Sequence, residues 1–300
     1  MRPIPPASCV LLALVVAAPG AWAIAPGQTT AFPTSGDWSG TTASNQPWSL
    51  ATSYVYQWNT YWNGTWYIGS AVAVAPNYLL TAGHVGATPG QSYTTINGTT
   101  YTAVSALTPP AAPGQTAVPD LCLVKVDHTL PGYNTLYTGS FSSGQNLFLV
   151  GYGLTGTYAP ANFAYTLTSG TDGIARWGTN AVYLTPFTQA SGSYNSMVFE
   201  MSAYDTNTPY EAFFGNGDSG GGTFVKVGNQ WELAGINAYI YSGVNGYYAS
   251  SAIAVPSYAA WISANAPVPE PASLAALIGL GCLLLRHRSR PASRTDSASK

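Results

Sequence analysis

Short runs of β-forming residues, separated by turn residues, fill the sequence between about residues 50 and 255. Val, Ile, Thr, Tyr and Trp are frequent in these runs, and such residues favour extended strands. The clearest strand candidates are residues 71–74, 121–126, 146–152, 198–201, 222–227 and 233–241. No long segment of this region repeats apolar residues at the spacing of an amphipathic helix. The pattern therefore predicts an all-β fold.

Three Asn-Gly pairs lie between these runs, at Asn63-Gly64, Asn97-Gly98 and Asn245-Gly246. Asn and Gly tolerate the positive φ angles of two-residue hairpin turns, so each pair predicts a tight hairpin. A single short helix is predicted at about residues 257–264, because Tyr258, Trp261 and Ile262 share one helix face.

Charge is sparse in this chain, since Asp, Glu, Lys and Arg make up 7% of its residues, where about 25% is typical. Between residues 24 and 267 the cations are Lys125, Arg176 and Lys226, against nine acids, which gives this body a net charge of −6. Nucleic-acid binding requires clustered cations that neutralise phosphates. The acidic body therefore argues against a nucleic-acid partner.

The cysteines exclude a disulfide framework in the body of the chain. Cys9 and Cys282 lie in apolar terminal segments, so only Cys122 remains between them. Because Cys122 stands in an apolar run with no neighbouring His, we expect a small core residue and not a reactive thiol.

Residues 1–23 have the three parts of a secretory signal peptide. Arg2 supplies the positive charge, residues 9–18 form the apolar centre, and Ala21-Trp22-Ala23 is a small-x-small cleavage site. We therefore expect the chain to be exported.

The C-terminal segment, residues 267–300, has a second processing pattern. Val268-Pro269-Glu270-Pro271 precedes the apolar run 272–285, and the basic cluster 286–290 follows it. As a helix this run would be about 21 Å long, which is short for a permanent membrane span of about 20 residues. In combination these parts resemble the PEP-CTERM sorting signal of Gram-negative bacteria that make extracellular polysaccharide.

That resemblance implies an exosortase-type membrane enzyme as a partner. It also implies transient inner-membrane association through a short helix at 272–285, and a final location that is secreted or on the cell surface or in the extracellular matrix. An ordinary membrane anchor is the alternative interpretation of the same residues.

The strongest chemical signal is the glycine-rich segment Gly215–Gly222, which contains Asp218 and Ser219. A nucleophilic serine requires a sharp turn that exposes its oxygen and backbone N–H groups aimed at the developing negative charge. Two further segments supply the partners that such a serine needs. His84 follows an apolar strand candidate, and Asp120 begins another. In that chemistry Ser attacks, His carries the proton, and Asp orients the imidazole.

At these three segments the chain resembles the chymotrypsin family of serine proteases. Thr81-Ala82-Gly83-His84-Val85, Asp120–Val126 and Gly217-Asp218-Ser219-Gly220-Gly221 match the family patterns, in the family order His, Asp, Ser. Weaker similarity at residues 150–153, 233–236 and 258–262 extends the resemblance over about residues 50–265.

The resemblance implies two packed antiparallel six-stranded β-barrels with a short C-terminal helix. It implies a protease domain at 24–266, with the first barrel at about 50–130, the second at about 140–255 and the helix at about 257–264.

Residue by residue, the resemblance implies His84 as general base and acid, Asp120 as its orienting partner and Ser219 as the nucleophile. The backbone N–H groups of Gly217 and Ser219 would form the oxyanion hole, and Asp218 would hold the loop. Asp127 is the competing acid, at the far end of the same strand candidate, and His128 beside it is expected to be a solvated loop residue.

The chain also departs from the family. Ile24, the first residue after the expected cleavage, lies 60 residues before His84 and lacks the family's activating Ile-Val-Gly-Gly sequence. We therefore expect no activation by a released N-terminus, and the partner of Asp218 stays open.

The expected substrate-binding residues are Phe213, at the pocket base, and Ala238-Tyr239-Ile240, along the pocket wall. No acid stands at the pocket base, although Glu211 is close in sequence, and Ile240 would make the pocket shallow. We expect a preference for small or apolar side chains before the cleaved bond.

Together these observations predict an exported serine endopeptidase that acts on proteins or peptides without a cofactor. No metal is expected, because His84 has no second ligand at metal-binding spacing. A non-catalytic extracellular matrix or binding protein on the same scaffold is the main alternative. An α/β-hydrolase esterase is disfavoured, because there the Ser precedes the Asp and the His.

Overall fold

The computed structural model describes residues 25–26, 53–153, 156–159, 164–167, 173, 175–202, 212–242 and 248–268. The chain divides into two units, residues 1–266 and 267–300. The expected signal peptide, the apolar segment 272–285 and the Asn245-Gly246 turn lie outside the described residues. Within the described part of the chain, no helix is both long and apolar enough to cross a membrane.

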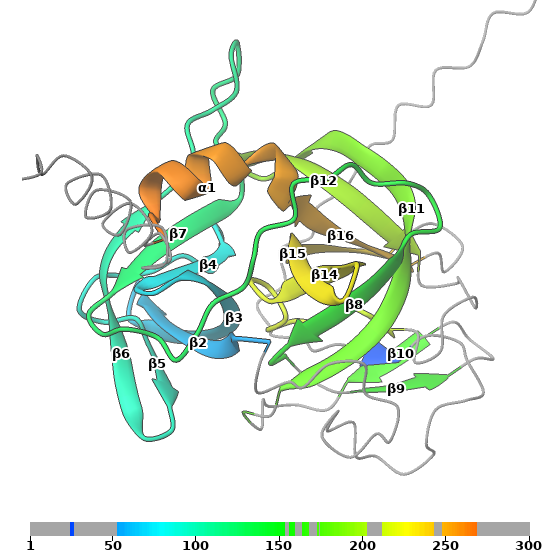
Figure 1. Ribbon diagram of the computed structural model, residues 1–300. Coiled ribbons are helices and arrows are strands. Elements are labelled where there is room, and N and C mark those ends of the chain that lie inside the picture. Colours follow the sequence, from blue (N-terminus) through cyan, green and yellow to red (C-terminus); the bar gives the residue numbers. More distant parts are fainter. Residues whose placement is uncertain are drawn as a thin grey trace, which may run out of the picture. The chain divides into compact units, whose positions relative to one another are not determined.

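Six antiparallel strands close the first barrel, in the order β2-β3-β4-β7-β6-β5 (Figure 1). They are β2 (Val55–Trp62), β3 (Thr65–Ala75), β4 (Tyr78–Ala82), β5 (Tyr93–Ile96), β6 (Thr99–Leu107) and β7 (Leu121–Val126). Asn63-Gly64 joins β2 to β3 and Asn97-Gly98 joins β5 to β6, with positive φ at all four residues. Both predicted tight hairpins are therefore confirmed.

Six further antiparallel strands close the second barrel, in the order β11-β12-β16-β15-β14-β8. They are β8 (Asn146–Gly151), β11 (Arg176–Ser191), β12 (Tyr194–Ser202), β14 (Gly222–Val227), β15 (Gln230–Ser242) and β16 (Tyr248–Ala254). Two small sheets accompany this barrel: β9 (Gly156–Ala159) with β10 (Ala164–Leu167), and β1 (Ala25–Pro26) with β13 (Ala212–Phe213). The predicted all-β fold with two six-stranded barrels is confirmed.

The last element among the described residues is the helix α1 (Ala259–Asn265). It begins two residues later than predicted, because Val255–Ser257 form a separate 3-10 turn (η4) around Pro256. Tyr258, at φ −120°, separates the turn from the helix.

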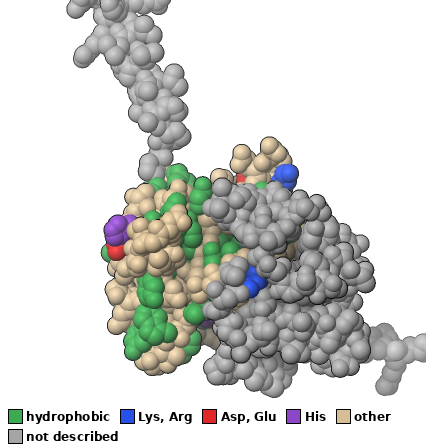
Figure 2. All heavy atoms as spheres, turned by 90° about the horizontal axis from the view of Figure 1, so that it is seen from below, with side chains coloured by type: hydrophobic (Ala, Val, Ile, Leu, Met, Phe, Trp, Pro, Cys, Tyr) green, Lys and Arg blue, Asp and Glu red, His purple; other side chains and the backbone are tan. Residues whose placement is uncertain are grey.

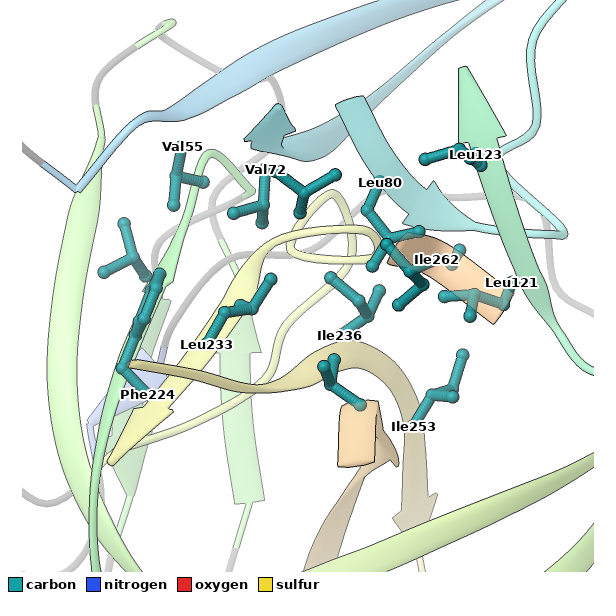
Figure 3. Packing of buried hydrophobic residues seen from close by; sticks show 14 of the residues in the cluster. Val55, Val72, Leu80, Leu121, Leu123, Phe224, Leu233, Ile236, Ile253 and Ile262 are labelled. Atoms are coloured by element: carbon teal, nitrogen blue, oxygen red, sulfur yellow. The ribbon is translucent and has the colours of Figure 1, made fainter. Parts of the chain in front are cut away.

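One hydrophobic cluster joins the two barrels and α1. Figure 3 shows Val72, Leu80 and Leu121 from the first barrel facing Leu233, Ile236 and Ile253 from the second, with Ile262 of α1 among them. Each of these side chains is at most 1% exposed, and full burial of such a side chain contributes about 1.5–3 kcal/mol. The two barrels therefore pack against each other through a continuous core.

Cys122 belongs to the separate core inside the first barrel and is 5% exposed. Burial, with a further contribution from the charge of Asp120, raises the pKa of its thiol to about 12. The thiol is therefore protonated at neutral pH, and Cys122 is the core residue that the sequence predicted.

The described surface carries little charge, as the composition predicts. On the face that Figure 2 shows, most of the described side chains are hydrophobic or uncharged and polar. Trp66, 53% exposed, lies against Tyr61 and Tyr93 at centroid distances of 5.1 and 5.6 Å. These three rings form an aromatic cluster on the first barrel, in which Trp66 is exposed and the two tyrosines are half-buried.

Candidate active site

Two neighbouring strands of the first barrel bring His84 to Asp120. Strand β4 ends at Ala82 and β7 begins at Leu121, and these two residues are paired across the antiparallel ladder. The residues just beyond them therefore meet. His84 Nδ1 lies 2.8 Å from Asp120 Oδ2, and the His84 backbone N–H donates to Asp120 Oδ1 at 2.6 Å.

The glycine between these strands allows the approach. A Cβ on Gly83 would lie 3.0 Å from both the carboxylate and the backbone of Asp120. Asp120 is fully buried, whereas the His84 side chain is 38% exposed. The carboxylate is thus shielded from solvent while one edge of the imidazole remains accessible.

The surroundings of His84 determine which ring nitrogen carries the proton and in which direction the pKa of the ring is shifted. A carboxylate only accepts hydrogen bonds, so Nδ1 donates to Asp120 and Nε2 is left to accept a proton. Packing of protein around the ring lowers the pKa of His84, but the charge of Asp120 and its hydrogen bond outweigh this and raise the pKa above 6.5. His84 is therefore a stronger base than a free imidazole.

The second barrel also contacts Asp120. The Asp120 backbone N–H donates to Ser196 Oγ at 2.9 Å, and that oxygen lies 3.3 Å from the Tyr239 hydroxyl. Burial, then the charge of Asp120, raises the pKa of Tyr239 above its ordinary value. The Tyr239 phenol therefore stays neutral beside the Asp120 carboxylate.

Ser219 lies in the turn between β13 and β14. Gly217 and Gly220 have φ angles of +89° and +86°, which residues other than glycine rarely adopt. A Cβ on Gly220 would also overlap Ser70 O and Thr81 Oγ1. The glycines therefore permit both the backbone shape of this turn and its close contact with the first barrel.

The backbone of Ser219 is bound to strand β3. The Ser70 N–H donates to Ser219 O at 2.8 Å. A Cβ on the neighbouring Gly69 would lie 3.1 Å from Ser219 O and 2.8 Å from Val85, the residue after His84. These contacts bring the Ser219 turn beside the segment that carries His84. Both residues are among those described, and their side chains make no hydrogen bond to each other.

Asp218 is fully buried behind the turn. Its carboxylate accepts the N–H of Gly215 at 2.9 Å and that of Gly153 at 3.2 Å. Burial raises the pKa of Asp218 to about 8, while these two N–H groups and the charge of Arg176 act to lower it. The hydrogen-bond partners that the sequence left open for Asp218 are therefore Gly215, in the same turn, and Gly153, in the loop after β8, while the charge of Arg176 on β11 acts on the same carboxyl group.

The register between β11 and β8 determines the position of Arg176. Arg176 pairs with Gly151 across β11 and β8, and paired residues project from the same face of a sheet. A Cβ on Gly151 would overlap the Asp218 carboxylate. The Arg176 side chain, which is 6% exposed, therefore projects from the face of the β8–β11 sheet against which the Asp218 carboxylate lies.

The expected substrate-binding residues are distributed as follows. Phe213 is 4% exposed in β13, where it pairs with Ala25. Ala238 is half-buried, and Ile240, on the same strand β15, is 39% exposed. Ile24 itself lies outside the described residues, but its neighbour Ala25 pairs with Phe213, which precedes Asp218 by five residues.

Asp127, the competing acid, lies at the opposite end of β7 from Asp120. It accepts the Thr102 N–H at 2.9 Å and contacts His128 at 2.8 Å. The His128 side chain is 60% exposed, as expected of a solvated loop residue. The structure therefore brings Asp120, and not Asp127, to His84.

Sequence reasoning missed two buried polar residues that hold the turn. Ser70 contacts it from the first barrel, and Asn237 contacts it from β15 of the second. Asn237 had a detectable signal, because it is a polar residue inside the apolar run 233–241. Ser70 follows Gly69 at the start of a small apolar run, and nothing in the sequence distinguishes it.

Comparison with known proteins agrees with this fold. The family model described as Trypsin matches residues 40–262. The active form of the Rv3671c protease from M. tuberculosis is similar at a TM-score of 0.50 and 12% identity, covering 74% of this chain and 85% of its own. Neuropsin, a serine protease of mouse brain, is similar at a TM-score of 0.50 and 15% identity, covering 72% of this chain and 96% of its own.

A search of curated proteins found no match. At these low identities the two solved structures support the fold alone. The family model, however, spans well over half of the chain. This chain therefore belongs to the trypsin family.

Proposed function

We propose that the chain is an exported serine endopeptidase that hydrolyses peptide bonds through Ser219, His84 and Asp120. The observation that supports this most directly is the double contact of Asp120 with the ring and the backbone of His84. Such a contact selects the imidazole tautomer whose Nε2 is free to take a proton. The Ser219 turn beside the His84 segment supplies the nucleophile.

The proposed reaction has two halves. Ser219 Oγ attacks the substrate carbonyl carbon, and its proton passes to His84 Nε2. The N–H groups of Gly217 and Ser219 donate to the resulting oxyanion. When the intermediate collapses, the peptide C–N bond breaks and the amine leaves with the proton from His84. Water then attacks the acyl-enzyme by the same route and releases the acid.

Asp120 stays ionised throughout this cycle. Its charge stabilises the imidazolium that forms on His84, and its two hydrogen bonds keep the ring oriented. Asp218 takes no part in proton transfer; through Gly215 and Gly153 it holds the turn that carries both oxyanion donors.

Replacement of the nucleophile tests this proposal. Ser219→Ala is expected to lower kcat by about 10⁶-fold with an unchanged melting temperature, because the bonds that hold the turn are made by the Ser219 backbone. A fluorophosphonate probe should label the wild type and not Ser219→Ala. Peptidase activity that survives the substitution would refute the assignment, and absence of labelling in the wild type would favour the non-catalytic binding protein.

We also propose a preference for small or apolar side chains before the cleaved bond. The proposed pocket residues, Phe213, Ala238, Tyr239 and Ile240, carry no charge that would select Arg or Lys. A panel of chromogenic peptides measures this preference. Fast cleavage after Arg would contradict it, and Ile240→Gly should extend cleavage toward larger apolar side chains.

The export proposal rests on the sequence pattern of the two ends. Residues 1–23 would be removed on export, and an exosortase-type enzyme would recognise residues 267–300 and their apolar segment 272–285. Mass spectrometry of the mature protein from a Gram-negative host with such an enzyme tests both steps. Recovery of the full-length chain from the cytoplasm would contradict them.

A further inference from the structure

Ser70 is fully buried in β3, and each of its polar atoms makes a hydrogen bond, with its N–H and its hydroxyl both donating to the Ser219 turn. Its N–H donates to Ser219 O at 2.8 Å, and its hydroxyl donates to Gly217 O at 2.8 Å. The same hydroxyl accepts the N–H of Tyr152 at 3.0 Å. Its carbonyl accepts the Thr81 hydroxyl at 2.7 Å.

These bonds fall on the two residues that matter most for charge stabilisation. In the proposed mechanism the oxyanion donors are the N–H groups of Gly217 and Ser219. The carbonyls of the same two residues are the ones that Ser70 binds, one by its hydroxyl and one by its N–H. We propose that Ser70 is a positioning residue that orients both oxyanion donors from across the interface between the barrels. This inference rests on the function proposed above.

The physical need for such an anchor comes from the glycines of the turn. Gly217, at φ +89°, has no side chain to restrict rotation of its flanking peptide groups. A bond to its carbonyl holds the peptide group between Gly217 and Asp218. With that group held, fewer orientations remain for the preceding peptide group, which carries the Gly217 N–H. Stabilisation of an oxyanion depends on donors that are already aimed at it, so loss of the anchor weakens the transition state more than the substrate complex.

A hydroxyl is suited to this position because it donates and accepts at once. It accepts the Tyr152 N–H and donates to Gly217 O, so it links the loop after β8 to the turn. The next residue of that loop, Gly153, donates to Asp218. The segment 152–153 is thus tied to the turn through Ser70 on one side and Asp218 on the other.

Kinetics of Ser70→Ala separate positioning from mere stability. We expect kcat to fall by roughly 10–100-fold with little change in KM, because misplaced donors cost transition-state stabilisation. Affinity for a peptide boronic acid, which mimics the tetrahedral intermediate, should fall by the same factor as kcat/KM. Ser70→Thr, which keeps the hydroxyl, should recover most of the lost kcat.

Ser92→Ala is the matched control. Ser92 is also a fully buried serine of the first barrel, and its hydroxyl also makes two bonds, to Thr60 at 2.7 Å and to the Thr88 N–H at 2.7 Å. Both substitutions should lower the melting temperature, but only Ser70→Ala should lower kcat. If Ser70→Ala does not fold, Ser70→Cys, which keeps a weak donor, is the variant to measure.

Amide hydrogen exchange gives a readout that does not need activity. Exchange at residues 217–221 should accelerate in Ser70→Ala and not in Ser92→Ala. Equal kcat and equal exchange in the two variants would overturn the positioning role. If instead the wild type shows no activity that depends on Ser219, the proposed function fails, and the exchange measurement alone decides whether Ser70 orients the turn.

Discussion

The two halves of the proposed catalytic site are held in different ways. His84 and Asp120 are joined by two direct contacts at the adjacent ends of β4 and β7, within one barrel. The Ser219 turn makes few bonds of its own and is held from three distant segments: β3, the loop after β8, and β15. One half is a short-range pair of side chains, whereas the other is a network that needs both barrels.

Asn237 illustrates the network from the second barrel. Its backbone O accepts the Gly220 N–H at 2.8 Å, and its N–H donates to Gly221 O at 2.9 Å. Its side chain accepts the Thr223 hydroxyl at 2.8 Å and donates to Val150 O at 3.1 Å. A turn held by such dispersed bonds depends on correct packing of the whole domain, whereas the pair His84–Asp120 depends on one strand register.

Apart from replacement of the nucleophile, the largest expected effect lies in the half formed by His84 and Asp120. Asp120→Asn should lower kcat by about 10⁴-fold, because the amide holds the wrong imidazole tautomer and cannot stabilise imidazolium. Steady-state kinetics with a peptide substrate measures the change. Asp127→Asn is the matched control at the other end of β7 and should keep kcat within about twofold, as surface changes usually do. A large loss from Asp127→Asn instead would reverse the assignment of the acid.

A substitution in the Ser219 turn should lower kcat by a smaller factor, but it should lower the melting temperature as well. Asp218→Asn replaces one acceptor by an NH₂ group that must face an N–H donor, either that of Gly215 or that of Gly153. We expect kcat to fall by about 10²–10³-fold, comparable to loss of an oxyanion donor. The melting temperature should fall together with kcat. An Asp218→Asn variant with wild-type kcat would show that the turn does not need this carboxylate.

A smaller effect is expected at Asn237. Asn237→Ala removes the side-chain bonds to Thr223 and Val150 but leaves the backbone bonds to Gly220 and Gly221. Unpaired buried groups should cost about 1–3 kcal/mol of unfolding free energy. Because the backbone contacts remain, kcat should change little. Urea denaturation and kinetics on the same sample test this, and a kcat loss as large as that of Asp218→Asn would contradict it.

The smallest effect is a shift in pH dependence. His84 must be neutral to act as a base, and Asp120 raises its pKa above 6.5. Activity should therefore rise with pH through a midpoint above 6.5, and Asp120→Asn should move that midpoint downward. The sign for stability is opposite: the His84–Asp120 contribution is complete below pH 6.5 and is lost as the pH rises through the raised pKa. An activity midpoint unchanged in Asp120→Asn would contradict the electrostatic coupling.

Much of the local structure was readable from the sequence. The strands predicted at 121–126 and 222–227 have the observed bounds of β7 and β14, and two Asn-Gly pairs form the expected hairpins. These features depend on neighbours in sequence, so local propensity identifies them. The start of α1 was misplaced by two residues, because Pro256 closes a separate 3-10 turn.

The long-range half was not readable in the same way. One partner of Asp218, left open by the sequence, lies 65 residues away at Gly153. Ser70 lies 147 residues from the Gly217 that it binds. The first of these contacts is made by closure of the second barrel and the second by its packing on the first. One serine among many has no local pattern that reveals its partner.

By itself, then, the sequence determined the β-rich class of the fold and the chemical types at His84, Asp120 and Ser219, because strand propensity, turn residues and short motifs are local properties. The tertiary structure alone decided what holds the Ser219 turn in place. That support consists of buried hydrogen bonds from Ser70, Gly153 and Asn237. The bonds from Gly153 and Asn237 require closure of the second barrel, and those from Ser70 also require the two barrels to pack together.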